Sequence, residues 1–179
     1  MRKIDAAFRL AVFAVLCSAA TALAQNPGAV GPAPGPIPPA LLAAKAIFIS
    51  NDGADGGLFP HPFSGDPNRG YDQFFGAMQG SGQYQLVPDP SQADLVVELH
   101  LTAPYGPTNA NKVNGAADPV PTLRLVIYDR KSHFVLWSLT ESIVAANLQK
   151  THDRNFDEAV VNLVSDFEAL THRPPAPGH

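Results

Sequence analysis

Two strand-like runs near the carboxyl end constrain the fold of this 179-residue chain more than any other feature. Residues 122–129 and 133–143 are rich in strand-forming side chains, and the segment 130–132 between them is short enough for a hairpin turn. Asp129 suits the start of that turn, because its short carboxylate accepts hydrogen bonds from backbone N–H groups further along. One face of the first run carries Leu123, Leu125 and Ile127. The pattern predicts an antiparallel hairpin with one face against a core.

Three further strands are predicted upstream, over 45–50, 84–87 and 95–101. The third alternates most clearly, with one face formed by Leu95, Val97, Leu99 and Leu101. A helix is expected between the first two strands, with Asp66 as its N-cap and Pro67 at its first helical position. The apolar face of that helix consists of Tyr71, Phe74, Phe75 and Met78.

A second helix is predicted after the hairpin. Asn155, followed three residues later by Glu158, has the spacing of a capping box, so the helix is expected to begin at Asn155. Its apolar stripe consists of Phe156, Ala159, Val160, Leu163, Val164, Phe167 and Leu170. Two long polar stretches, 51–66 and 103–119, are predicted as loops.

These elements define the fold class. The order is β-α-β-β-β-β-α, which predicts an α/β protein of the α+β type. We expect a single mixed or mostly antiparallel sheet of about five strands, with two amphipathic helices mainly on one side. The predicted domain covers residues 41–171.

The amino-terminal segment indicates export. Residues 1–24 combine an early positive charge, a short apolar run and a small-residue site for cleavage between Ala24 and Gln25, as in a secretory signal peptide. Cys17 does not follow a small residue, which favours a soluble periplasmic or secreted product over a lipid-anchored one. After cleavage no cysteine and no transmembrane segment would remain. The Pro- and Gly-rich segment 25–40 is predicted as a disordered linker, and 172–179 as a disordered tail.

Charge narrows the choice of partner. The chain carries 12 Lys and Arg against 16 Asp and Glu, and the part after residue 24 carries 9 against 15. This acidic balance argues against nucleic acid or an anionic membrane surface as the partner.

Residues 51–66 hold the best candidates for a chemical site. Asp52, Asp55, His61 and Asp66 are candidate metal ligands, but Gly53 stands where a calcium loop requires an oxygen ligand. Ser64 lacks the sequence context of a hydrolase nucleophile. The sequence therefore predicts no catalytic residue, no metal site and no cofactor.

Two functional hypotheses remain open. The favoured one is a non-enzymatic interaction domain that binds another envelope protein through 51–66, 103–119 or a sheet edge. The alternative is a small-molecule, metal-ion or hydrolytic site at 51–66.

Several short segments also suggest a family resemblance. They are 82–87, 93–99, the Leu-Val-Ile-Tyr-Asp run at 125–129, the Val-Leu-Trp run at 135–137, and the helix after Asn155. This succession resembles small α/β domains of bacterial envelope accessory proteins, including the amino-terminal domain of TolB and envelope families of unknown function. The resemblance implies an accessory role in the envelope and transfers no binding residue.

Overall fold

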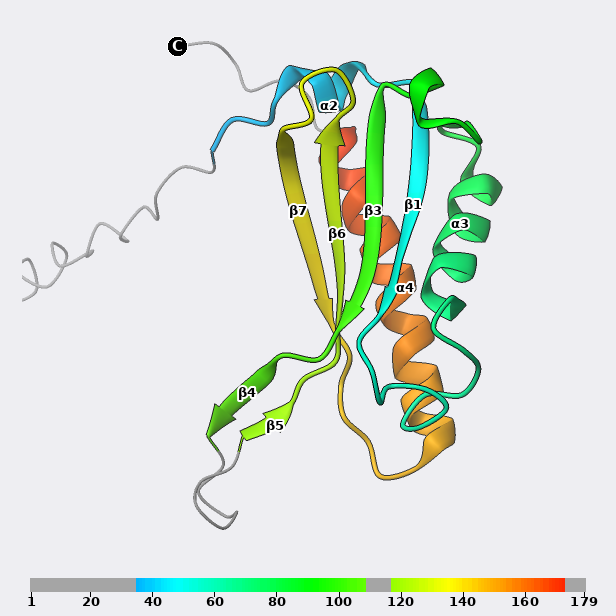
Figure 1. Cartoon of the computed structure of the whole chain (residues 1–179), viewed down its shortest axis with the longest axis vertical. Coiled ribbons are helices and arrows are strands. Elements are labelled where there is room, and N and C mark those ends of the chain that lie inside the picture. The colour runs from blue at the N-terminus through cyan, green and yellow to red at the C-terminus, as the bar shows by residue number, and fades with distance from the viewer. Residues whose placement is uncertain (1–34, 109–116, 173–179) are drawn as a thin grey trace, which may run out of the picture. The chain divides into compact units, whose positions relative to one another are not determined.

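A five-stranded mixed sheet forms the centre of the fold (Figure 1). The computed structural model describes residues 35–108 and 117–172. The strand order across the sheet is β2-β1-β3-β6-β7. The strands are β1 (Ala46–Ala54), β2 (Gln85–Leu86), β3 (Leu95–Thr102), β6 (Thr122–Asp129) and β7 (Val135–Ser142).

The sheet has a parallel half and an antiparallel half. β1 runs parallel to both of its neighbours, β2 and β3, whereas β3, β6 and β7 pair antiparallel. In the predicted hairpin, the Asp129 carboxylate accepts hydrogen bonds from the N–H and hydroxyl groups of Ser132, as a turn-opening Asp should. The predicted fold class is confirmed, including the number of strands in the main sheet.

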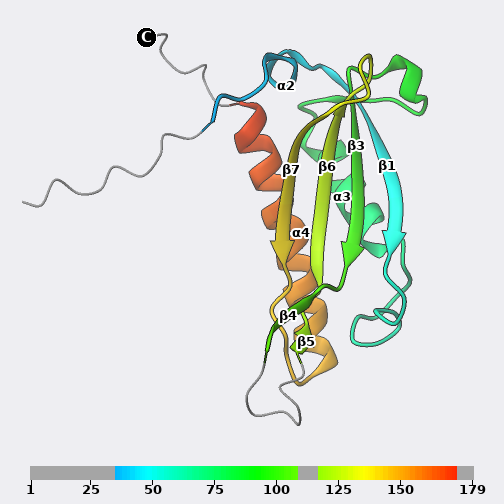
Figure 2. The ribbon, with the colours of Figure 1, turned by 60° about the vertical axis from the view of Figure 1, so that its left-hand side comes forward.

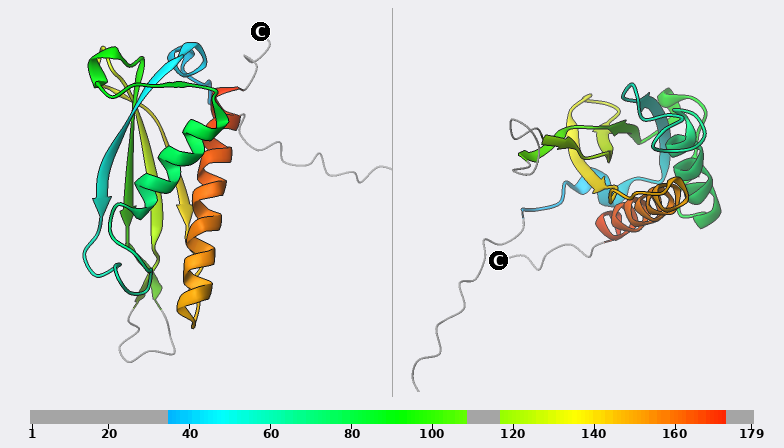
Figure 3. Two further views of the ribbon diagram at one scale, coloured as in Figure 1. Left: turned by 90° about the vertical axis from the view of Figure 1, so that its right-hand side faces the viewer. Right: turned by 90° about the horizontal axis from the view of Figure 1, so that it is seen from below.

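Two long helices lie side by side over one face of the sheet (Figures 2 and 3). α3 (Arg69–Ser81) contacts β1 and β3, and α4 (Gln149–Thr171) contacts β6 and β7. Their apolar faces close the core on the side chains that alternate along the strands. The core side chains with no exposure include Phe63, Phe74, Met78, Phe156, Leu163 and Phe167. A short helix, α2 (Pro39–Ala43), and a 3₁₀ turn (Pro90–Gln92) complete the helical elements that the described residues contain.

The predicted start of α4 is wrong. The helix begins at Gln149, so Asn155 lies inside it, and the Asn155 side-chain amide donates to the Val144 carbonyl instead of capping N–H groups. The start of α3 differs by less. Its N-cap is Asn68, while the Asp66 carboxylate accepts the Asn68 N–H in the turn that precedes the helix, and Pro67 stands outside it.

The two predicted loops also contain strands. β1 continues through Ala54, so only the later part of 51–66 is irregular. The stretch 103–119 contains β4 (Tyr105–Thr108) and β5 (Ala117–Pro119), which pair antiparallel. We call β4 and β5 the arm, because in Figure 1 they extend beyond the end of the main sheet.

The predicted signal peptide 1–24, most of the linker 25–40, and 173–179 of the tail lie outside the described residues. The end of the predicted linker is ordered, since Pro39 and Ala40 belong to α2. Among the helices described, none is long and apolar enough to cross a membrane.

Candidate functional site

The segment 55–66 is packed onto the body of the domain. Phe63 is fully buried, and its ring centroid lies 5.2 Å from that of Phe156 and 5.9 Å from that of His152, both on α4. Leu58 is also buried. Burial of a Phe and a Leu side chain contributes about 1.5–3 kcal/mol each, so this segment is held by the core as well as by polar contacts.

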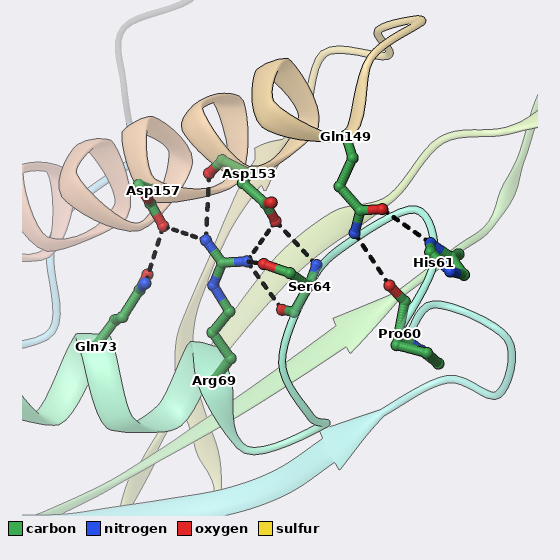
Figure 4. A network of polar contacts seen from close by, with 8 residues as sticks. All are labelled: Pro60, His61, Ser64, Arg69, Gln73, Gln149, Asp153 and Asp157. Atoms are coloured by element: carbon green, nitrogen blue, oxygen red, sulfur yellow. Dashed lines mark hydrogen bonds and ion pairs between the residues drawn. The ribbon is translucent and has the colours of Figure 1, made fainter.

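Arg69 is the centre of the polar network that fixes this segment (Figure 4). Its Nη1 lies 2.6 Å from Asp153 Oδ1, and its Nη2 lies 2.6 Å from Asp157 Oδ1. Nη1 also donates to the Ser64 carbonyl, and the Ser64 N–H donates to Asp153 Oδ1. The guanidinium carbon lies 4.6 Å from the centre of the Phe156 ring. Arg69 thus joins the 55–66 segment to both long helices.

This network shifts the pKa of its charged groups. Burial alone lowers the pKa of Arg69, but the hydrogen bonds that Arg69 donates to Asp153 and Asp157 outweigh burial, and the net pKa is raised. For Asp153, burial raises the pKa, whereas the Ser64 N–H and Arg69 lower it, and the net pKa is lowered. Both groups are therefore held in their charged forms, which suits a structural clamp.

Asp52 and Asp55 meet at His100 on β3. His100 Nδ1 lies 2.9 Å from the Asp52 carbonyl oxygen and 3.3 Å from Asp52 Oδ2, and His100 Nε2 lies 3.2 Å from Asp55 Oδ1. The other Asp55 oxygen accepts hydrogen bonds from the Thr102 hydroxyl and the Ala103 N–H. These contacts tie the end of β1 to the end of β3 and to the base of the arm.

The same contacts stabilise opposite charges. The Ala103 N–H, the Thr102 hydroxyl and His100 lower the pKa of Asp55. Burial lowers the pKa of His100, but its bond to the Asp52 carbonyl and the two carboxylates outweigh burial, so the pKa of His100 is raised.

The other two candidate ligands lie elsewhere. His61 Nδ1 is 2.9 Å from Gln149 Oε1, and the Gln149 amide also donates to the Pro60 carbonyl (Figure 4). Asp66 accepts the Asn68 N–H before α3. The four predicted candidates are therefore distributed over three places. Within residues 35–108 and 117–172, no three His, Cys, Asp or Glu side chains are grouped in a way that could hold a metal ion.

A largely apolar pocket of about 370 Å³ lies between segment 55–66, the base of the arm and the start of α4. Tyr105 stands at this pocket with 82% of its surface exposed. His152 is the one titratable lining side chain besides Tyr105. The complete lining is Gly56, Gly57, Leu58, Pro62, Phe63, Ala103, Tyr105, Pro119, Pro121, Ile143, Ala145 and His152.

Sequence reasoning did not find this pocket, because its walls come from four separated segments. The partners of the 55–66 segment, Asp153 and Gln149, are 84 to 89 residues away from the groups that they bind. The sequence pattern predicts a helix N-terminus at Asn155. In the structure α4 begins at Gln149, and the contacts with the 55–66 segment come from the residues ahead of Asn155.

No protein-family model matches the chain, and comparison with curated proteins gives no match. Several solved bacterial structures resemble it. The PelC dodecamer from Paraburkholderia phytofirmans is 11% identical, with 73% of this chain and 89% of that one covered and a TM-score of 0.42. The LpoB C-terminal domain from Salmonella enterica is 13% identical, with 62% and 97% covered and a TM-score of 0.36. Lipoprotein GNA1162 from Neisseria meningitidis is 16% identical, with 68% and 99% covered and a TM-score of 0.31.

This likeness concerns the general arrangement of helices and strands alone. One of these neighbours is a lipoprotein, while an accessory role in the bacterial envelope stays a prediction for this chain. The finer resemblance, to the amino-terminal domain of TolB, stays a prediction.

Proposed function

We propose that this chain is an exported accessory domain of the bacterial cell envelope that binds another envelope protein and catalyses no reaction. Export to the periplasm or beyond follows from the signal-like pattern of residues 1–24. The partner is expected to be a protein, because the acidic composition disfavours nucleic acid and anionic membrane surfaces.

The observation that carries this proposal is the apolar pocket next to the exposed Tyr105. Tyrosine is enriched at protein interfaces, since its ring supplies apolar contact area and its hydroxyl remains available for a hydrogen bond. A partner's apolar side chain would enter the pocket, and Tyr105 would cover it. In many interfaces, a few side chains that are anchored in pockets in this way contribute most of the binding energy.

The polar side chains around the pocket support binding over catalysis. Asp55, Asp153 and His61 each have short hydrogen bonds that hold backbone segments or helices together. A general base or nucleophile must instead be directed at a substrate position. These three side chains hold the segments beside the pocket in place.

The experiment compares two matched substitutions. Tyr105→Asp places a charge at the pocket, and Val161→Asp places the same charge on α4, where Val161 is 65% exposed and lines no described pocket. Each purified variant is used to capture partners from an envelope fraction of the source organism. We expect one protein to be retained by the parent and by Val161→Asp and lost with Tyr105→Asp. Retention of that protein by Tyr105→Asp would refute the proposed surface.

A small-molecule site at the 51–66 segment is the second candidate function. A volume of about 370 Å³ lies within the range of small-ligand pockets, about 300–1,000 Å³. Here the measurement is thermal melting with added anions, divalent cations and small apolar compounds. A rise in melting temperature that disappears in Ala145→Trp, which fills the pocket, would favour this second function, because a ligand stabilises only the state that binds it.

A further inference from the structure

A second concave surface lies at the edge of the main sheet that β1 and β2 form, between β1 and α3. It is a groove of about 460 Å³, and it shares no lining residue with the pocket beside the arm. Tyr71 and Phe75 form its wall on α3, with ring centroids 5.8 Å apart. Residues 48–51 of β1 form the other wall.

The β1 side of this groove is a strand edge without a full partner. β2 is only two residues long, against nine for β1. The last hydrogen bond that the structure records between β1 and the segment after β2 runs from the Val87 N–H to the Ile47 carbonyl. Pro88 follows and has no N–H group, so the chain turns away and leaves β1 beyond Ile47 uncovered on this edge.

The alternation of backbone direction identifies the free groups. Successive residues of a strand send their N–H and C=O groups to opposite neighbours. Since the Ile47 carbonyl bonds toward β2, the backbone groups of Ile49 and Asn51 point to the same edge. Both residues line the groove. From Phe48 to Asn51 the edge offers about 13 Å of regular strand at ~3.3 Å per residue, because the register with β3 shifts between Asn51 and Ala54.

The charges around the groove indicate which kind of peptide it can bind. Each of its three lining segments continues into an exposed Asp: Asp52 follows Asn51, Asp72 follows Tyr71, and Asp89 follows Pro88. The only Lys and Arg side chains of residues 35–108 are Lys45 and Arg69; Arg69 is engaged with α4, and His100 lies 3.3 Å from Asp52. A bound segment therefore meets negative charge from Asp72 on the α3 wall and from Asp89 beside Pro88, whereas His100 compensates the charge of Asp52.

We propose that this groove binds an extended, basic peptide segment of a partner protein, which adds a strand to the free edge of β1. The peptide's backbone would bond to Ile49 and Asn51, and every second side chain would lie on Tyr71 and Phe75. Its Lys or Arg side chains would lie near Asp72 and Asp89. This site is independent of the pocket beside the arm, so the failure of either proposal leaves the other intact.

The probe is a capped hexapeptide of alternating Lys and Val, compared with the same peptide of alternating Glu and Val. Amide hydrogen exchange of the purified chain is followed by NMR at increasing peptide concentration. We expect the lysine peptide to slow exchange at least tenfold at Ile49 and Asn51. Ser50, whose amide faces β3, should change less than twofold. The glutamate peptide should bind at least tenfold more weakly.

Matched variants separate this groove from general charge effects. Tyr71→Arg should weaken binding of the lysine peptide at least tenfold, and Val161→Arg, which adds the same charge on α4, should leave it unchanged. If Tyr71→Arg does not fold, Asp72→Lys is used, since Asp72 is exposed, and a loss of about fivefold is expected.

Three results would overturn the proposal. One is the absence of lysine-peptide binding at millimolar concentration. Another is slowed exchange along β7, the other edge of the sheet, in place of Ile49 and Asn51. The third is protection of Ile49 and Asn51 that rises with protein concentration in the absence of peptide, because a second copy of the chain would then fill the groove.

Discussion

Removal of the Arg69 side chain tests the clamp between α3, α4 and the 55–66 segment. Arg69 is 15% exposed, and its partners Asp153 and Asp157 are 22% and 53% exposed, so the network lies between the buried and the surface cases. Breaking a buried pair costs about 3–5 kcal/mol and breaking an exposed one about 0–1. Arg69→Ala also removes the contact with the Phe156 ring. We expect a loss of about 2–3 kcal/mol in the free energy of unfolding.

The assay is urea unfolding followed by circular dichroism, with thermal melting as a second readout. A loss of this size should lower the melting temperature by about 8–12 °C for a domain of this length. Arg154→Ala is the matched control, because the Arg154 to Glu158 ion pair is 3.6 Å long with both side chains 66% exposed. That control should cost less than about 0.5 kcal/mol. Arg69→Lys should recover less than half of the loss, because an ammonium group cannot bond to both carboxylates as a planar fork does.

The effect should also depend on pH. The folded-state pKa of Asp153 is depressed, so its contribution is present above the ordinary carboxylate pKa of about 4 and is lost as the pH falls through the folded-state value. The gap between the parent and Arg69→Ala should therefore narrow below about pH 4. A loss below about 1 kcal/mol at pH 7, or one no greater than for Arg154→Ala, would refute the clamp.

Three further predictions concern stability. The pKa of His100 is raised in the folded state, so the stability that it adds is present below the unfolded-state pKa of about 6.5 and is lost as the pH rises through the folded-state pKa. His100→Gln should therefore lower the free energy of unfolding at pH 5.5 and leave it nearly unchanged at pH 9, as measured by urea titration. Gly82→Ala should cost about 1 kcal/mol in thermal melting, because Gly82 has a φ of 63° after α3 while nothing lies within 4 Å of an added Cβ; no change would contradict this reason. Leu163→Ala should lower the free energy of unfolding by about 2–5 kcal/mol, because Leu163 is fully buried. Val161→Ala, two residues away, should cost less than about 0.5 kcal/mol, because Val161 is 65% exposed. Similar losses for the two variants would show that the core face of α4 is assigned wrongly.

The parts of the fold that the sequence predicts well are those with a clear local period. β3 alternates strictly between a core face and an open face, and β6 does so apart from the buried Val126, so their core residues follow from period two. The buried face of α4 follows from its apolar spacing in the same way. Such a pattern shows which face of an element packs against the core, and it can be recognised without knowledge of contacts to distant parts of the chain.

The site was less predictable, because long-range contacts override local signals there. Asn51 and Gly53 suggest a turn, yet pairing with β3 extends β1 to Ala54. The Asn155 pattern suggests a helix start, yet contacts of Gln149 and Asp153 with the 55–66 segment extend α4 by six residues. The arm was missed because Gly and Pro within 103–119 are typical of loops.

The position of β1 has a consequence for how the chain becomes a domain. β1 is the first strand to be synthesised, but both of its neighbours in the sheet, β2 and β3, come later, and β3 ends only at Thr102. A chain that emerges from its amino end therefore holds β1 without β3, its longer neighbour, until more than half of the sequence has appeared. For the export that we propose, a transport machinery that accepts only unfolded chains would act within this interval. Deletion of residues 46–54 would divide the sheet rather than trim it, because β2 pairs with no other strand.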